Sequence, residues 1–112
     1  MQIPFAAWLI FVAAAVLEVA GDAVIRKGLR GAGTGMVVAG CVILGMYGLV
    51  VNVVSWDFSK LLGVYVAVFA IVSVFCGLLV FHENVPASTW VGVLIAVAGG
   101  LVIQFGSAMV PR

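Results

Sequence analysis

Residues 13–27 read AAAVLEVAGDAVIRK, and this stretch decides how the rest of the chain is interpreted. Glu18 interrupts an apolar segment that runs from Phe5 to about Ile25. A helix that crosses a bilayer needs about 20 mostly apolar residues, so the segment is long enough to span. A carboxylate within such a span is costly and normally faces a protein interior or a water-filled path. The stretch therefore predicts a membrane helix that carries an embedded acidic group.

The composition of the whole chain agrees with a membrane protein. Hydrophobic residues make up 66% of the sequence and charged residues only 8%, whereas soluble domains average about 25% charged residues. The formal net charge is +1, and no basic run or pattern of stacking aromatic residues accompanies it. These features exclude a nucleic-acid partner and predict that the lipid bilayer surrounds the protein.

Four apolar runs are separated by charged residues, glycine or proline. The predicted helices cover about residues 5–25, 36–54, 61–81 and 87–105 of a single transmembrane domain formed by residues 1–112. No run alternates with a period of two, and membrane strands would require a closed barrel, so helices are favoured. We therefore expect an all-α membrane protein with four transmembrane helices and both termini on the same side.

The distribution of basic residues gives little information on orientation. Arg26, Lys27 and Arg30 lie on one side of the membrane, and Lys60 and Arg112 lie on the other. Because the positive-inside rule depends on this imbalance, a difference of one permits insertion in both directions. Two oppositely inserted copies would form an antiparallel, dual-topology dimer, with the symmetry that alternating-access transporters use. The alternative is one orientation with the first loop in the cytoplasm.

Glu18, Asp22 and Arg26 are spaced four residues apart and therefore share one helix face. Asp22 could form an ion pair with Arg26 or contact a ligand. Glu18 could bind a hydroxyl or amide elsewhere in the bundle. Alternatively, a proton or a cationic substrate could neutralise Glu18, and one carboxylate cannot hold both. If this site opened alternately to each side, the competition would make the protein an exchanger.

Further candidates for a substrate or proton site are aromatic and hydroxyl side chains in the second and third runs. They are Tyr47, Tyr65, Phe69 and Ser73. Aromatic residues at helical spacing usually serve packing. However, a ring face close to Glu18 would attract a bound cation through a cation–π interaction.

The fourth run contains a track of small residues, formed by Gly92, Ala96, Gly99 and Gly100. Small residues at a spacing of four allow helices to approach closely in lipid. The track could serve dimer packing or packing within one chain. A chain of four short spans encloses little space for a substrate path by itself, which favours an oligomer.

The sequence lacks the motifs of common enzyme classes. It contains no nucleophile elbow, no phosphate-binding loop and no His/Glu metal pair. Cys41 and Cys76 do not have the spacing of metal ligands. We therefore expect neither an enzyme nor a metal site nor another cofactor.

Residues 17–26 (LEVAGDAVIR) and 92–99 (GVLIAVAG) make the chain resemble the small multidrug resistance family of the drug/metabolite transporter superfamily. In that family the first helix carries an embedded Glu, a Gly three residues later and a basic residue eight residues later. Glu18, Gly21 and Arg26 match these positions. The resemblance implies an antiparallel homodimer, or a heterodimer with a paralogous chain, in the bacterial cytoplasmic (inner) membrane. It also implies exchange of protons for small or hydrophobic cations at Glu18.

The third helix departs from the pattern of that family. Leu61 replaces a proline, Tyr65 lies one position before the expected tyrosine, and Phe69 replaces a tryptophan. Ile71 and Ser73 replace the glycines of a kink. These positions belong to the substrate site and the gate in the family, so the departures concern the range of compounds that bind.

A second resemblance suggests a different substrate. Residues 82–92 (HENVPASTWVG) are similar to the four-helix subunits that translocate aminoarabinose-modified undecaprenyl phosphate. Arg26, Lys27 and Arg30 would then meet a phosphate, although Glu18 would be a poor neighbour for an anion. A third hypothesis is a non-transporting accessory subunit of the membrane, in which Glu18→Gln would change nothing.

Overall fold

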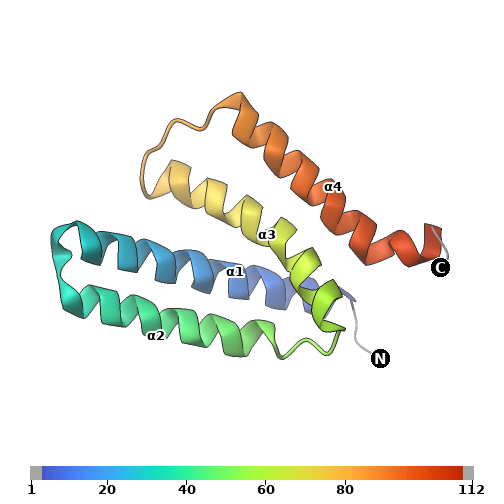
Figure 1. Cartoon of the computed structure of the whole chain (residues 1–112), viewed down its shortest axis with the longest axis horizontal. Coiled ribbons are helices and arrows are strands. Elements are labelled where there is room, and N and C mark those ends of the chain that lie inside the picture. Colours follow the sequence, from blue (N-terminus) through green and yellow to red (C-terminus); the bar gives the residue numbers. More distant parts are fainter. Residues whose placement is uncertain (1–3, 110–112) are drawn as a thin grey trace. The chain divides into compact units, whose positions relative to one another are not determined.

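The computed structural model describes residues 4–109, which form helices and their connections (Figure 1). The helices are α1 (Pro4–Lys27), α2 (Thr34–Val51), α3 (Phe58–Leu79) and α4 (Ala87–Met109). All four are long and apolar enough to cross a membrane, and no strand occurs among the described residues. The predicted fold class, an all-α membrane protein with four transmembrane helices, is confirmed.

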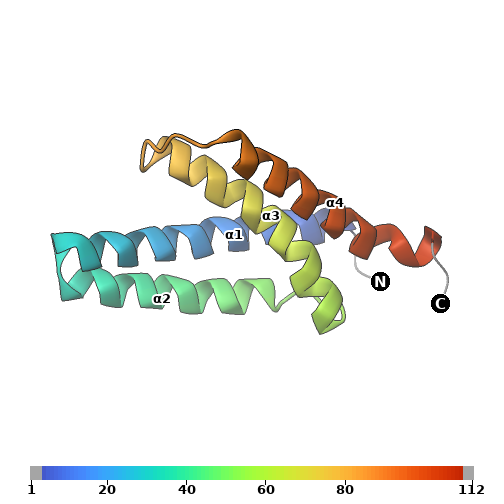
Figure 2. The same ribbon diagram turned by 45° about the horizontal axis from the view of Figure 1, so that its top comes forward.

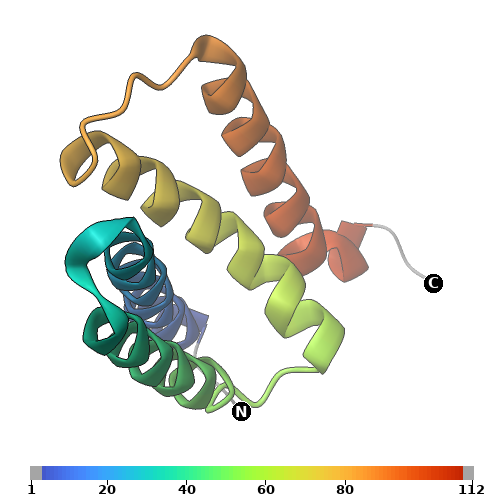
Figure 3. The ribbon, with the colours of Figure 1, turned by 60° about the vertical axis from the view of Figure 1, so that its left-hand side comes forward.

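The chain divides into two compact units, Met1–Ser55 and Trp56–Arg112. Each unit is a helical hairpin, because α1 packs against α2 and α3 packs against α4. The two helices of each hairpin run in opposite directions (Figures 2 and 3). A single four-helix domain stays a prediction.

The first hairpin turns through a short glycine-rich connection, Gly28–Ala32, followed by Gly33. The backbone leaves helical geometry at Arg30, and Gly31 and Gly33 have positive φ angles of 127° and 106°. Glycine adopts such angles without a steric cost, which explains why this connection contains several glycines. This connection brings α2 back along α1.

Helix α2 ends at Val51, three residues before the predicted end. The Asn52 side chain donates a hydrogen bond to the Gly48 carbonyl at 2.8 Å. The next turn is tighter than an α-helix, because the Val53 N–H donates to the Val50 carbonyl at 3.3 Å. Three-residue hydrogen bonds of this kind are common where a helix ends. The apolar residues Val53 and Val54 therefore did not reveal the helix end.

Helix α3 begins at Phe58, three residues before the predicted start, and ends at Leu79, two residues before the predicted end. At its start the Asp57 carbonyl accepts a hydrogen bond from the Leu61 N–H at 2.8 Å. After its end His82 takes a positive φ angle of 53°, which turns the chain toward α4. Ser59 and Lys60 thus belong to the helix, and the Lys60 Nζ atom lies 4.5 Å from the centre of the Trp56 ring.

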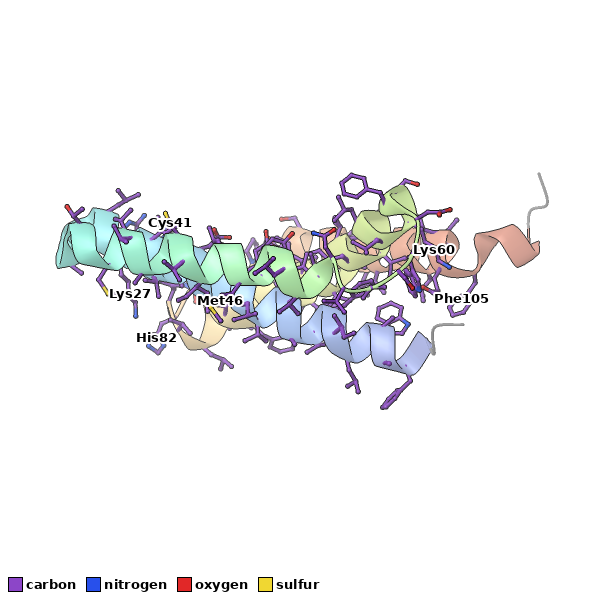
Figure 4. All side chains as sticks on the ribbon, turned by 90° about the horizontal axis from the view of Figure 1, so that it is seen from below. Lys27, Cys41, Met46, Lys60, His82 and Phe105 are labelled. Carbon is purple, nitrogen blue, oxygen red and sulfur yellow. The ribbon has the colours of Figure 1, made fainter. Side chains whose placement is uncertain are left out.

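The outward faces of the helices are apolar. Cys41 and Met46 project from α2 (Figure 4), and both are exposed. Leu49 on α2 and Leu94 on α4 are exposed by 75% and 69%. Apolar side chains at such exposure match the hydrocarbon core of a bilayer, in which the backbone polar groups must bond within the helix. A charged or polar side chain inside a span is therefore unusual and is a candidate for a functional group.

Candidate functional site

Glu18 lies on the seam where α1 and α2 pack together. The seam residues follow one another at intervals of three and four positions, which places them on one face of each helix. The contacts pair Gly28 with Val37, Ile25 with Gly40, and Gly21 with Leu44. Each step of three or four residues along α1 thus matches an equal step back along α2. The same register places Glu18 opposite Tyr47.

The closest approach of the two helices is at Gly21 and Gly40. A Cβ atom added to Gly40 would lie 2.7 Å from the Gly21 carbonyl oxygen. A Cβ atom added to Gly21 would lie 3.1 Å from the Gly40 carbonyl oxygen. The backbones of α1 and α2 therefore meet directly, and a side chain at position 40 would collide with the backbone of α1.

Along α1, Glu18 is one helical turn from Gly21. Along α2, Tyr47 is two helical turns from Gly40. The Glu18 carboxylate and the Tyr47 hydroxyl are close enough to interact electrostatically. Both side chains are half-buried, while Ala14 and Ala15 next to Glu18 are fully buried. The acidic group is thus neither directed fully into lipid nor sealed in the core.

Asp22 and Arg26 continue along α1 from Glu18 toward the first connection. Both side chains are exposed and one helical turn apart. This spacing suits an ion pair between neighbouring turns. An ion pair and a ligand contact by Asp22 both stay predictions.

The third-helix candidates all lie on α3, in the second hairpin, where two of them contact each other. The rings of Tyr65 and Phe69 are 6.3 Å apart at an angle of 33°, and only 3% of Tyr65 is exposed. The Ser73 hydroxyl donates a hydrogen bond to the Ala70 carbonyl at 2.9 Å. Bonding to the preceding turn occupies the only donor of this hydroxyl. A role of these three side chains in binding stays a prediction.

The small residues of α4 do not share one environment. A Cβ atom added to Gly100 would lie 2.7 Å from the Ala67 Cβ atom, so Gly100 packs against α3. Gly92 and Gly99 have open space at the same position and are exposed, while Ala96 is half-buried. Gly100 therefore serves packing within the chain. Dimer packing by the other three residues stays a prediction.

Gly40 is a residue of this region that the sequence did not single out. Its importance comes from its position opposite Gly21, and that pairing depends on the register between two helices. The only signal in the sequence is the glycine itself in the middle of a span, and α2 contains further glycines that face open space.

Metal coordination has no support in residues 4–109, because they contain no group of three metal-ligating side chains.

These features define a multi-pass membrane protein with an acidic group on the seam of its first hairpin. The chain belongs to the YnfA/UPF0060 family, described as an uncharacterised family, whose model matches residues 5–109. The UPF0060 membrane protein YfjF of Bacillus subtilis (strain 168) is 32% identical over 99 residues. That similarity covers 87% of this chain and 91% of YfjF. No solved structure matches the chain.

Proposed function

We propose that this protein is a small transporter that exchanges protons for small or hydrophobic cationic compounds at Glu18. The observation that carries the proposal is the position of Glu18, half-buried on the seam between two spans and opposite Tyr47 in the register of the two helices. Ionisable groups inside membrane spans are rare and usually mark a pathway. The resemblance of residues 17–26 to the small multidrug resistance family supports the same role.

The chemistry follows from the cost of a charge in hydrocarbon. An ionised carboxylate requires a compensating positive charge or a proton when water is excluded. Proton binding and cation binding at Glu18 are therefore mutually exclusive. If the site opens alternately to the two sides, a proton that enters from one side displaces the bound cation to that same side. After the site reorients, a cation from the other side displaces the proton there, so the two ligands cross the membrane in opposite directions. The ring of Tyr47 offers a face to which a cation is attracted.

The proposed assembly is an antiparallel homodimer in a bacterial cytoplasmic membrane. The nearly equal distribution of basic residues permits both orientations. Gly92 and Gly99 leave open space on the outward side of α4, where a second copy could pack closely. In this assembly each chain contributes one Glu18 to a shared path.

Proton release upon cation binding tests the proposed function. Purified protein in detergent at weak buffer strength is mixed with guanidinium, tetraphenylphosphonium and other cations that span small and hydrophobic classes. We expect release of protons that saturates together with cation binding, because the two ligands compete for one carboxylate. Absence of release with every cation would contradict the proposal.

A lipid-linked phosphate is a second candidate substrate. Arg26, Lys27 and Arg30 are all exposed at the end of the first hairpin, and arginine and lysine are the usual ligands of phosphate. Undecaprenyl phosphate is therefore included in the panel. Binding of this lipid without proton release by any cation would favour the second candidate over the first.

Labelling of a single cysteine tests the topology. Ala32→Cys is introduced into a Cys41→Ala/Cys76→Ala background, because Ala32 is exposed in the first connection. We expect a membrane-impermeant maleimide added to intact cells to label about half of the molecules, since the basic residues favour neither orientation. Asn84→Cys, in the connection between α3 and α4, is the matched second position. Labelling of all or none of the molecules would contradict dual topology.

A further inference from the structure

We infer that Gly40 is a positioning residue for Glu18: its missing side chain lets α2 approach α1 closely enough to hold Tyr47 beside the carboxylate. This inference rests on the proposed role of Glu18 in exchange. It assigns to a residue of α2, which itself contacts no substrate, control over the environment of the exchanging group.

Gly40 meets backbone atoms of α1 as well as a side chain. A Cβ atom added there would overlap the Ile25 side chain and would lie 2.7 Å from the Gly21 carbonyl oxygen and 3.0 Å from the Ile25 nitrogen. Two of these neighbours are backbone atoms of a regular helix, which cannot rotate away as the end of a side chain can. A methyl group at this position must therefore move the helices apart.

The first hairpin is closed at one end and open at the other. The connection Gly28–Ala32 joins α1 and α2 at one end, so a wedge at Gly40 opens the hairpin away from that end. At about 1.5 Å per residue, Tyr47 lies roughly 10 Å beyond Gly40. The separation imposed at Gly40 is therefore expected to grow toward Tyr47 and Glu18. Electrostatic interactions at short range in a medium of low dielectric constant respond strongly to such a change.

Few other ionisable groups face Glu18. On α1, Asp22 and Arg26 lie one and two turns away along the same face. Helix α2 contains no Asp, Glu, Lys, Arg or His, and its Cys41 is exposed on the outward side. Tyr47 is therefore the titratable side chain of α2 that faces Glu18 across the seam. A wedge at Gly40 therefore acts on Glu18 chiefly through Tyr47.

The chain offers a matched control on the same helix. Gly45 is five residues from Gly40, and a Cβ atom added to Gly45 would meet nothing within 4 Å. Gly40→Ala and Gly45→Ala make the same chemical change and alter helix propensity equally. A difference between them therefore reports the contact with α1.

The experiment follows protonation of Glu18 by infrared spectroscopy of its carboxyl band, assigned by its loss in Glu18→Gln. We expect Gly40→Ala and Tyr47→Phe each to shift the pH profile of this band in the same direction, and Gly45→Ala to leave it unchanged. The double variant Gly40→Ala/Tyr47→Phe should shift little beyond Tyr47→Phe, because both changes remove one interaction. Cation affinity should fall about tenfold in Gly40→Ala and stay unchanged in Gly45→Ala.

Two results would overturn the inference: the same pH profile for Gly40→Ala and the wild type, or fully additive shifts in the double variant. If Gly40→Ala fails to fold, Gly21→Ala replaces it. That methyl group meets mainly the flexible Leu44 side chain, at 2.9 Å, and is a milder wedge at the same crossing. The infrared titration needs no substrate. A Gly40-dependent profile without cation-induced proton release would therefore refute the proposed function and leave the positioning role intact.

Discussion

Glu18→Gln is expected to abolish proton release on addition of any cation and to weaken cation binding more than tenfold, or by at least about 1.4 kcal/mol. Glutamine preserves the size of the side chain and its hydrogen-bonding capacity, but it can neither lose a proton nor attract a cation by charge. The measurement is proton release together with direct binding of the same cation by calorimetry. Folding is checked by helicity and by elution in detergent.

Glu83→Gln is the matched control, because it makes the same chemical change at an exposed position outside the helices. We expect Glu83→Gln to release protons like the wild type. Full release by Glu18→Gln would show that the exchanging group is elsewhere and would favour an accessory role for this chain. Loss of release in both variants would mean that the assay reports overall charge instead of one site.

Gly100→Leu is expected to destabilise the second hairpin strongly, and Gly99→Leu is expected to leave it folded. A Cβ atom at Gly100 already lies 2.7 Å from the Ala67 Cβ atom, whereas one at Gly99 meets nothing within 4 Å. Overpacking of a close contact typically costs about 1–3 kcal/mol, and a leucine at a glycine contact belongs at the upper end. The measurement is the thermal midpoint of the purified protein in detergent. Equal midpoints for the two variants would contradict the packing of α4 on α3.

The same pair of variants separates folding from assembly. If Gly99 lies in the dimer interface, Gly99→Leu should reduce the dimer fraction, measured by cross-linking in the membrane, while the thermal midpoint of the hairpin persists. Small residues matter in membrane interfaces because van der Waals packing replaces the hydrophobic effect as the driving force. An unchanged dimer fraction in Gly99→Leu would place the interface on another face.

The sequence by itself determined the class of protein. Apolar runs of sufficient length must cross the membrane as helices, because lipid offers no hydrogen bonds to the backbone. Glu18 was recognisable for the same reason, since an acidic group in such a run is conspicuous. The connection at Gly31 and Gly33 was also predictable, because only glycine adopts its backbone angles without strain.

Only the tertiary structure decided which residues meet. Apolar side chains that face lipid and those that face another helix have similar composition, so the sequence of a span does not reveal its packed face. Gly99 and Gly100 are adjacent and chemically identical, yet only Gly100 is buried against α3. The opposition of Gly40 and Gly21, and with it the approach of Tyr47 to Glu18, depends on the register between two helices. Register is a property of the pair, because it arises from the fit of two surfaces that lie far apart along the chain.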